Sequence, residues 1–141
     1  MQRTIKREIR SLEEIFLFLG EFTGSHGIGP EGAYGVTLAV EELFTNMVKY
    51  NPQGDPDILL SLACDQRNFV ATLTDCGGIP FDVTQAAEVD TTKSLQERPV
   101  GGLGIHLVRQ MVDALEYHQN GRCGTVTIVK NLEQSDAFHH R

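Results

Sequence analysis

Apolar residues recur every three or four positions over residues 11–22, which predicts a helix with one buried face. Ser11 and Glu14 form a capping-box pattern at its start. After a break at residues 24–29, Pro30 suits the first turn of a second helix, which Asn51-Pro52 ends. The expected buried positions are Leu12, Ile15, Phe16, Leu19 and Phe22 in the first helix and Val36, Val40, Leu43, Phe44, Met47 and Val48 in the second.

The pattern then changes to strict alternation, over residues 58–64 and 69–73, with a polar turn between them. This predicts an antiparallel hairpin with one face on the core. Residues 4–9 and 125–132 are expected to add strands, and Asn120-Gly121 a turn. A third helix is expected from about Leu103 to Leu115. Helices on one side of a mixed, mostly antiparallel sheet make an α+β two-layer sandwich.

Residues 82–100 show no period, and a loop of this length in a compact domain is usually functional, often a lid, or else disordered. The 141 residues suffice for one domain, which we expect over residues 1–132, with a polar tail at 133–141.

Composition narrows the possible partners and the compartment. Twelve basic residues against 19 acidic ones give a net charge of −7, which argues against nucleic acid or an anionic membrane as the main partner. Cys64, Cys76 and Cys123 show no C-x-x-C spacing, so free, packed thiols in a reducing cytosol are expected. There is no signal-peptide pattern or membrane-spanning run, so we expect a cytoplasmic protein.

Glu42 and Asn46 are four residues apart in the second helix and therefore lie on one face, one turn apart. A solvated glutamate is the commoner reason for such a residue. A carboxylate and an amide oxygen are, however, ligands of the kind that Mg²⁺ takes when an anionic ligand lies nearby.

Asp75 follows a predicted core strand and precedes Gly77 and Gly78. One interpretation is a turn at the end of the strand, since glycine pairs often form turns. The other is a buried acceptor beneath a backbone that a flat ligand can approach closely.

Gly102, Leu103 and Gly104 open the third helix after Gly101. Free amides at a helix N-terminus, with glycines that permit close approach, form a phosphate site. The segment is neither a Walker loop nor a Rossmann fingerprint. A simply flexible loop is the alternative.

The order of these motifs resembles the GHKL superfamily, the ATP-binding fold shared by gyrase, histidine kinases, mismatch-repair proteins and a heat-shock chaperone. A helical Glu-x-x-x-Asn, a strand with Asp-x-Gly, a loop and a Gly-x-Gly helix start occur in that order, and Gly124-Thr125 follows on the last strand. The segments AVEELFTN and GGLGIHLVRQMVDALEY look like the anti-sigma-factor serine/threonine kinases of bacterial partner switching. The resemblance covers about residues 36–129 and implies a GHKL (Bergerat) fold that binds ATP and Mg²⁺.

The resemblance also implies a role for each matching residue. Asn46 would ligate Mg²⁺, and Glu42 would be the general base. Asp75, with Thr125 nearby, would accept a hydrogen bond from adenine, and a glycine at 77 or 78 would let the base approach. Residues 82–100 would be the ATP lid. Apart from the resemblance, Lys93 and Arg98 in this loop could reach the γ-phosphate, although charged residues of such a loop are usually only solvated. Backbone amides for the phosphates would come from Gly102, Leu103 and Gly104.

The implied function is a protein kinase and anti-sigma factor that binds a sigma factor, phosphorylates a small anti-sigma-factor antagonist and forms a homodimer. One alternative is a nucleotide-gated protein-binding module with little or no kinase activity. Another, the catalytic half of a histidine kinase, is disfavoured because no helix with an acceptor histidine precedes the domain. Two departures from the family pattern stand out: one extra residue between Asp75 and Phe81, and Tyr50 where a histidine is common.

Overall fold

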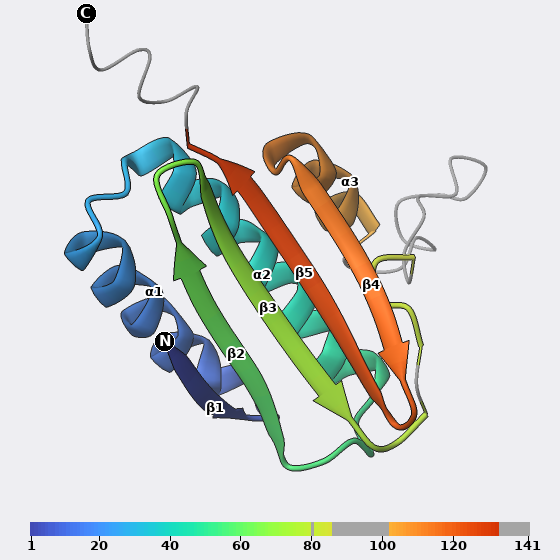
Figure 1. Cartoon of the computed structure of the whole chain (residues 1–141). Helices are drawn as coiled ribbons and strands as arrows, with labels where there is room; N and C mark the ends of the chain where they lie inside the picture. Colours follow the sequence, from blue (N-terminus) through green and yellow to red (C-terminus); the bar gives the residue numbers. More distant parts are fainter. Residues whose placement is uncertain (80, 86–101, 133–141) are drawn as a thin grey trace, which may run out of the picture.

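A computed structural model describes residues 1–79, 81–85 and 102–132 of the chain. These residues form a five-stranded sheet, three α-helices and one 3-10 turn (Figure 1). In chain order the elements are β1 (Gln2–Lys6), η1 (Ile9–Ser11), α1 (Leu12–Ser25), α2 (Pro30–Tyr50), β2 (Asp57–Cys64), β3 (Asn68–Cys76), α3 (Gly102–Met111), β4 (Ala114–Asn120) and β5 (Cys123–Asn131).

The sheet has the order β1-β2-β3-β5-β4, and each neighbouring pair of strands is antiparallel. β3 is therefore the central strand, with β2 on one side and the last strand, β5, on the other. In the β3–β5 register Asp75 is opposite Gly124 and Thr74 is opposite Thr125. This register determines which side chains share a face.

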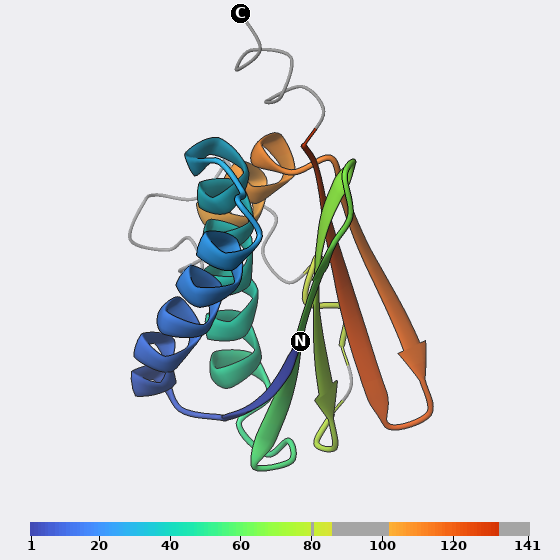
Figure 2. The ribbon, with the colours of Figure 1, turned by 60° about the vertical axis from the view of Figure 1, so that its left-hand side comes forward.

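The helices cover one face of the sheet, so the molecule has two layers (Figure 2). Alternate strand residues point into the space between the layers, and Leu60, Leu73 and Val126 are fully buried there. α2 contributes Val40 and Leu43, which are also fully buried. The expected α+β two-layer sandwich with helices on one face is confirmed, and the sheet is antiparallel throughout the described residues.

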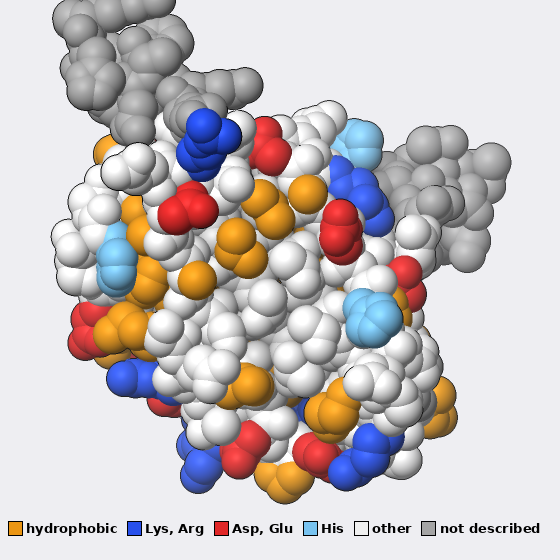
Figure 3. Space-filling view, in the orientation of Figure 1, with side chains coloured by type: hydrophobic (Ala, Val, Ile, Leu, Met, Phe, Trp, Pro, Cys, Tyr) orange, Lys and Arg blue, Asp and Glu red, His pale blue; other side chains and the backbone are white. Residues whose placement is uncertain are grey.

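Among the residues that the structure describes, no helix covers the other face of the sheet (Figure 2). The middle of this face carries mainly uncharged side chains (Figure 3). In β3 and β5 the residues that alternate with the core positions are mostly threonine or valine, and they are partly exposed. This alternation is typical of an antiparallel sheet with one solvated face.

Three local expectations were wrong. Ser11 makes no side-chain cap bond, because it has helical backbone angles at the end of η1 and does not start α1 from an extended conformation. Phe18 is buried in place of Phe16, which is 40% exposed. Residues 114–120 are a strand, β4, where helical spacing had predicted that the third helix continues to about Leu115, whereas the turn expected at Asn120-Gly121 is confirmed between β4 and β5.

Two of the three cysteines are joined, which corrects the expectation of free thiols. Cys76 and Cys123 are directly opposite each other in the β3–β5 register and form a disulfide across 47 residues of sequence. Cys64 is a free thiol. No local pattern indicates this pair, because only the β3–β5 register brings the two residues together.

Within the described residues, none of the helices combines the length and apolar character needed to cross a membrane. The expected lid lies mostly outside the described residues, which include only 82–85 of that region, and the tail at 133–141 lies outside them entirely.

Candidate functional site

α2 carries two polar side chains that are one turn apart and partly or fully buried. Asn46 is only 1% exposed, and Glu42 is partly buried. Within the described residues, the Glu42 Oε1 and Asn46 Nδ2 atoms are buried and have no hydrogen-bond partner. Buried polar atoms are nearly always paired in native proteins, so two unpaired atoms at adjacent turns need an explanation, such as a ligand that completes them.

Glu42 is also electrostatically unusual. Burial raises the pKa of its carboxyl, the neighbouring charge of Glu41 raises it further, and Lys49 partly offsets the two. A carboxylate with a raised pKa is a stronger proton acceptor than one in water. The position therefore suits a general base.

The first turn of α3 lies directly against Glu42. A Cβ atom on Gly104 would overlap the Glu42 carboxyl group, so glycine is what lets the two approach. Gly35 of α2 likewise lets α2 approach the end of α3, because a Cβ atom on Gly35 would lie 2.8 Å from the Met111 carbonyl oxygen. The amides at the start of α3, from Gly102 onward, are those that lack helical partners and attract anions.

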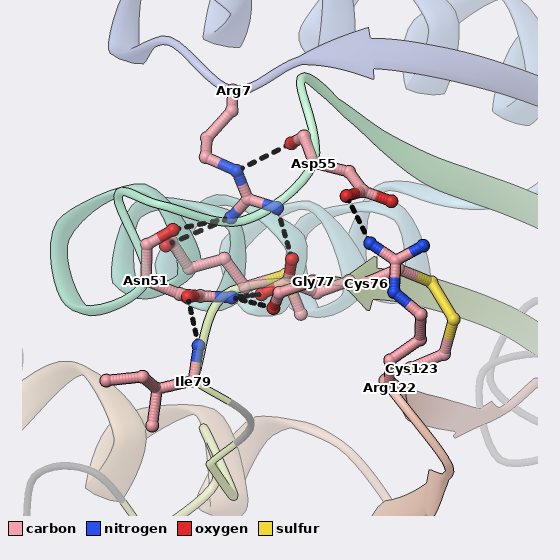
Figure 4. Close-up of polar contacts among 10 residues, drawn as sticks. Arg7, Asn51, Asp55, Cys76, Gly77, Ile79, Arg122 and Cys123 are labelled. Atoms are coloured by element: carbon pink, nitrogen blue, oxygen red, sulfur yellow. Dashed lines mark hydrogen bonds and ion pairs between the residues drawn. A yellow bond between two sulfur atoms is a disulfide. The ribbon is translucent and has the colours of Figure 1, made fainter.

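Asp75, near the end of β3, is bonded by several residues of a second polar cluster (Figure 4). Its Oδ2 atom accepts a hydrogen bond from Asn51 Nδ2 at 3.1 Å, and its Oδ1 atom pairs with Arg7 Nη2. The side chains of Asp75 and Arg7 are only 10% and 5% exposed. Arg7 and Asp75 form a buried ion pair, and the cluster links the residue after β1, the residue that caps α2 and the end of β3.

Asn51, at the C-terminal end of α2, fixes the turn after β3. Its Nδ2 atom also donates to Gly77 O at 3.2 Å, and its Oδ1 atom accepts from Ile79 N at 3.2 Å. Gly77 and Gly78 have φ angles of 78° and 66°, which favour glycine. A Cβ on Gly78 would overlap Asn51, and one on Gly77 would lie 2.9 Å from Arg122 Nη2. The turn thus requires both glycines.

A small hollow opens beside the Asp75 cluster, with a volume of about 10 Å³. It is lined by Met47, Asn51, Asp75, Phe81, Val83, Tyr117 and Gly124. This volume is enough for about one water molecule. A purine base would therefore enter only if the aromatic walls, Phe81 and Tyr117, moved apart.

Tyr117 covers the position opposite Asp75. Its ring lies over Gly124, where a Cβ atom would be 2.8 Å from Tyr117 Cε1. Burial raises the pKa of the Tyr117 hydroxyl, and the charges of Asp82 and Asp75 raise it further. The hydroxyl is therefore a neutral hydrogen-bond group at the edge of the hollow.

Comparison with known proteins decides what kind of domain this is. The sequence pattern of the histidine kinase-like ATPase domain matches residues 5–130, which is nearly the whole chain. The chain belongs to this family. A serine/threonine-protein kinase named BtrW, from Bordetella bronchiseptica, is 27% identical over 100 residues, covering 70% of each chain.

Two solved structures share the histidine kinase-like ATPase fold. The RsbU and RsbW domains of a Mycobacterium tuberculosis protein match 94% of this chain with a TM-score of 0.68 and 16% identity. The present chain spans about a third of that protein, 32% of its length. The histidine kinase domain of a blue-light activated histidine kinase from Erythrobacter litoralis matches 92% of this chain and 63% of its own, with a TM-score of 0.52 and 17% identity.

The structure of this ATPase domain brings most of the expected residues into two groups. Glu42, Asn46 and Gly104 form the first, and Asp75, Gly77 and Gly78 form the second. Gly102 and Leu103 begin α3 beside the first group. The choice between Gly77 and Gly78 for the adenine side stays a prediction.

The fold does not place the Thr125 side chain beside Asp75. Its hydroxyl lies 3.1 Å from the Thr74 hydroxyl, and this pair alternates with the Asp75–Gly124 pair along the strands. Successive strand residues point to opposite faces, so the Thr125 side chain is on the open face of the sheet and Asp75 is on the helix side. Gly124 and the ring of Tyr117 take the place beside Asp75.

Sequence reasoning missed four residues of the Asp75 cluster and hollow, which are Arg7, Asn51, Tyr117 and Gly124. Asn51 was recognised only as a helix stop, and Gly124 only as part of Gly124-Thr125. Arg7 is 68 residues from Asp75 in sequence, and nothing local to it indicates the pairing. Tyr117 is in the strand that was not predicted.

The residues present fit a magnesium ion that is shared with a bound phosphate. Within the described residues no three His, Cys, Asp or Glu side chains form a metal-binding group. Glu42 nevertheless supplies a carboxylate oxygen without a hydrogen-bond partner, and Asn46 supplies an amide oxygen one turn away, while its unpaired Nδ2 atom is a donor that suits a phosphate oxygen. Mg²⁺ usually takes one or two protein oxygens and completes its shell with phosphates and water.

Proposed function

We propose that this ATPase domain is an ATP-dependent protein serine/threonine kinase and anti-sigma factor. Its substrate would be a serine or threonine of a small anti-sigma-factor antagonist, in a bacterial partner-switching system. The observation that carries the proposal is the contact of Gly104 with Glu42, beside Asn46: a raised-pKa carboxylate, an unpaired amide and a helix N-terminus lie together. The name of the Bordetella relative supports the same activity.

Asp75 would accept a hydrogen bond from the amino group of adenine inside the hollow. The triphosphate would then run along α2 toward the start of α3. Asn51 and Glu42 are nine residues apart on α2, which is about 14 Å along the helix axis. An extended nucleoside triphosphate covers such a distance.

At the far end, amides of the first turn of α3, at Gly102, Leu103 and Gly104, would bind phosphate oxygens. Asn46 would hold Mg²⁺, which when bound neutralises phosphate charge and fixes the phosphate geometry. Glu42 would accept the proton of the attacking serine or threonine hydroxyl, whose oxygen bonds to the γ-phosphorus as ADP leaves. Phosphoryl transfer depends mainly on such positioning and charge neutralisation.

The test separates nucleotide binding from transfer. Titration calorimetry with Mg-ATP is expected to detect binding by the wild type and weakened binding by Asp75→Asn. In assays with radiolabelled ATP and candidate antagonist proteins, Glu42→Ala is expected to reduce phosphorylation about a hundredfold or more while binding ATP nearly as well as the wild type. Glu31→Ala, an exposed glutamate in the first turn of the same helix, is the control.

Other outcomes would favour other functions. Failure of the wild type to bind ATP would overturn the proposed nucleotide site. Equal regulation of a partner by the wild type and by Glu42→Ala would favour a nucleotide-gated binding module. Acid-labile phosphate on a histidine of a separate protein would indicate a histidine kinase. The proposed cytoplasmic residence, homodimer and sigma-factor partner need separate measurements, beginning with sedimentation of the purified chain.

A further inference from the structure

Arg7 is a buried cation to which the proposed mechanism gives no part. It follows β1 directly, and its side chain is only 5% exposed. The Nε atom donates to Asp55 O at 2.8 Å and the Nη1 atom to Asn51 O at 3.0 Å, while Nη2 pairs with Asp75. Burying a guanidinium is costly unless it is paired and hydrogen-bonded, so this set of contacts tightly specifies the position of the side chain.

Arg7 reaches Asp75 from the side away from the hollow. Asp75 and Asn51 line the hollow, whereas Arg7 lines a separate surface depression of about 380 Å³ beside the turn before β2. Gly54 makes this approach possible, because a Cβ atom there would overlap the guanidinium. Figure 4 shows Arg7 entering from the β1 side, with Asn51 between it and Ile79. The carboxylate of Asp75 thus contacts Arg7 behind it and the hollow in front.

The two partners of Asp75 orient its carboxylate. Arg7 is bound at Oδ1, and Asn51 Nδ2 is bound at Oδ2 at 3.1 Å. A carboxylate has about four acceptor positions, so two are left for a donor that enters the hollow. An ionised carboxylate has no hydrogen to donate. It therefore favours a ligand edge that carries an N–H group and disfavours one that carries a carbonyl oxygen.

We propose that Arg7 is a positioning residue that sets the purine selectivity of this site. By orienting the Asp75 carboxylate, it makes the hollow select a purine with an amino group at position 6 over one with hydrogen or oxygen there. The inference rests on the proposed function, since it takes the hollow as the place of the adenine base. A purely structural role is the competing explanation, because Arg7 also donates to the Met47 and Asn51 carbonyls at the end of α2.

The experiment compares ATP with purine riboside triphosphate, which differs by lacking the 6-amino group, and with GTP. Titration calorimetry of the full chain measures each affinity with Mg²⁺. The wild type is expected to bind ATP about tenfold or more tightly than purine riboside triphosphate, as is typical of a hydrogen bond to a charged group. Arg7→Met is expected to lower ATP affinity to the level of purine riboside triphosphate and to leave the latter affinity nearly unchanged.

A second variant and a control make the result decisive. Arg7→Lys keeps a buried positive charge, so it is the variant best suited to fold, but its single ammonium cannot reproduce the forked contacts. It is expected to reduce the ratio of the two affinities severalfold. Arg10→Met is the matched control, because the Arg10 side chain is 84% exposed and pairs with Glu8, away from Asp75. It is expected to keep the wild-type ratio.

Each result decides between the two roles. Arg7 variants that weaken ATP and purine riboside triphosphate by the same factor would overturn the selectivity role and leave a structural one. In an Asp75→Asn background, Arg7→Lys is expected to change the ratio no further; a further fall would mean that Arg7 acts independently of Asp75. If the wild type binds neither triphosphate, the proposed function fails, and the Arg7 assignment fails with it.

Discussion

The carboxyl group of Glu42 lies where the described residues compensate its charge only in part, through the nearby charge of Lys49. Burial is the main reason that its pKa is raised, and Glu41 adds to the effect. The Oε1 atom has no hydrogen-bond partner within the described residues. The residue thus lowers the stability of the folded chain in the absence of a ligand, as is common for groups that are kept for function.

This predicts how stability depends on pH. Near pH 4.5 the unfolded chain begins to lose the Glu42 proton, while the folded chain keeps it to higher pH. The contribution of Glu42 to the free energy of unfolding therefore falls as pH rises from 4.5 through the raised pKa. Glu42→Gln is expected to remove this fall and to be more stable than the wild type at neutral pH, as measured by urea unfolding at pH 5 and pH 7.5.

Glu31→Gln serves as the control in the same assay, because Glu31 is exposed on the same helix. It is expected to retain the wild-type pH dependence. If Glu42→Gln followed the same pH curve as the wild type, the carboxyl group would have to be solvated in the folded protein.

At the scale of elements, α2 and α3 approach closely because two glycines lie between them. Gly35 accommodates the carbonyl of Met111, and Gly104 accommodates the carboxyl group of Glu42. Gly104→Ala is expected to force α3 away from α2, to cost about 1–3 kcal/mol of unfolding free energy and to weaken Mg-ATP binding. Chemical denaturation and titration calorimetry measure the two effects.

Gly20→Ala is a matched control for that substitution. Gly20 is exposed in α1, and a Cβ atom there would meet nothing within 4 Å. Alanine in a helix interior is favoured over glycine, so this variant is expected to gain up to about 1 kcal/mol. A Gly104→Ala protein as stable as the wild type, with normal ATP affinity, would argue against close contact of the two helices.

The disulfide joins β3 to β5 where the Asp75 cluster begins. Cys76 lies between Asp75 and Gly77, and the bond closes a loop of 47 residues. Chain-entropy arguments give a stabilisation of up to about 4 kcal/mol for a loop of this length. The double variant Cys76→Ser/Cys123→Ser is expected to lose unfolding free energy up to that amount, measured by urea denaturation without reductant.

Cys64→Ser is the control, since Cys64 is a free thiol. Reductant is expected to destabilise the wild type and Cys64→Ser alike, and to leave the double variant unchanged. Intact mass and thiol counting of the purified wild type provide the direct check: three free thiols under non-reducing conditions would contradict the bond.

For the whole molecule, the sequence predicted the architecture better than it predicted the contacts. Amphipathic spacing identified α1 and α2, and alternation identified β2 and β3, because each pattern is local and has a single period. β4 was missed because it is an edge strand with many polar residues, and because Val112 and Leu115 continued the helical spacing of α3. The capping box failed because η1 precedes α1 directly.

The residues of the candidate site also fall into those that could be predicted from the sequence and those that could not. Glu42, Asn46 and the glycines before and within α3 were predictable, since each motif is a short segment in a fixed order. Arg7 was not, because its partner is 68 residues away and only the folded sheet brings them together. The face on which Thr125 lies could not be derived either, since it depends on the β3–β5 register.

The strand order also has a consequence for synthesis of the chain. β3, which bears Asp75, forms its hairpin with β2 early, but its other neighbour, β5, is the last strand to leave the ribosome. Until residue 131 has emerged, one edge of β3 has no partner, and such an edge can pair with other chains. Nascent chains that stall before β5 are therefore the form of this protein most in need of a chaperone.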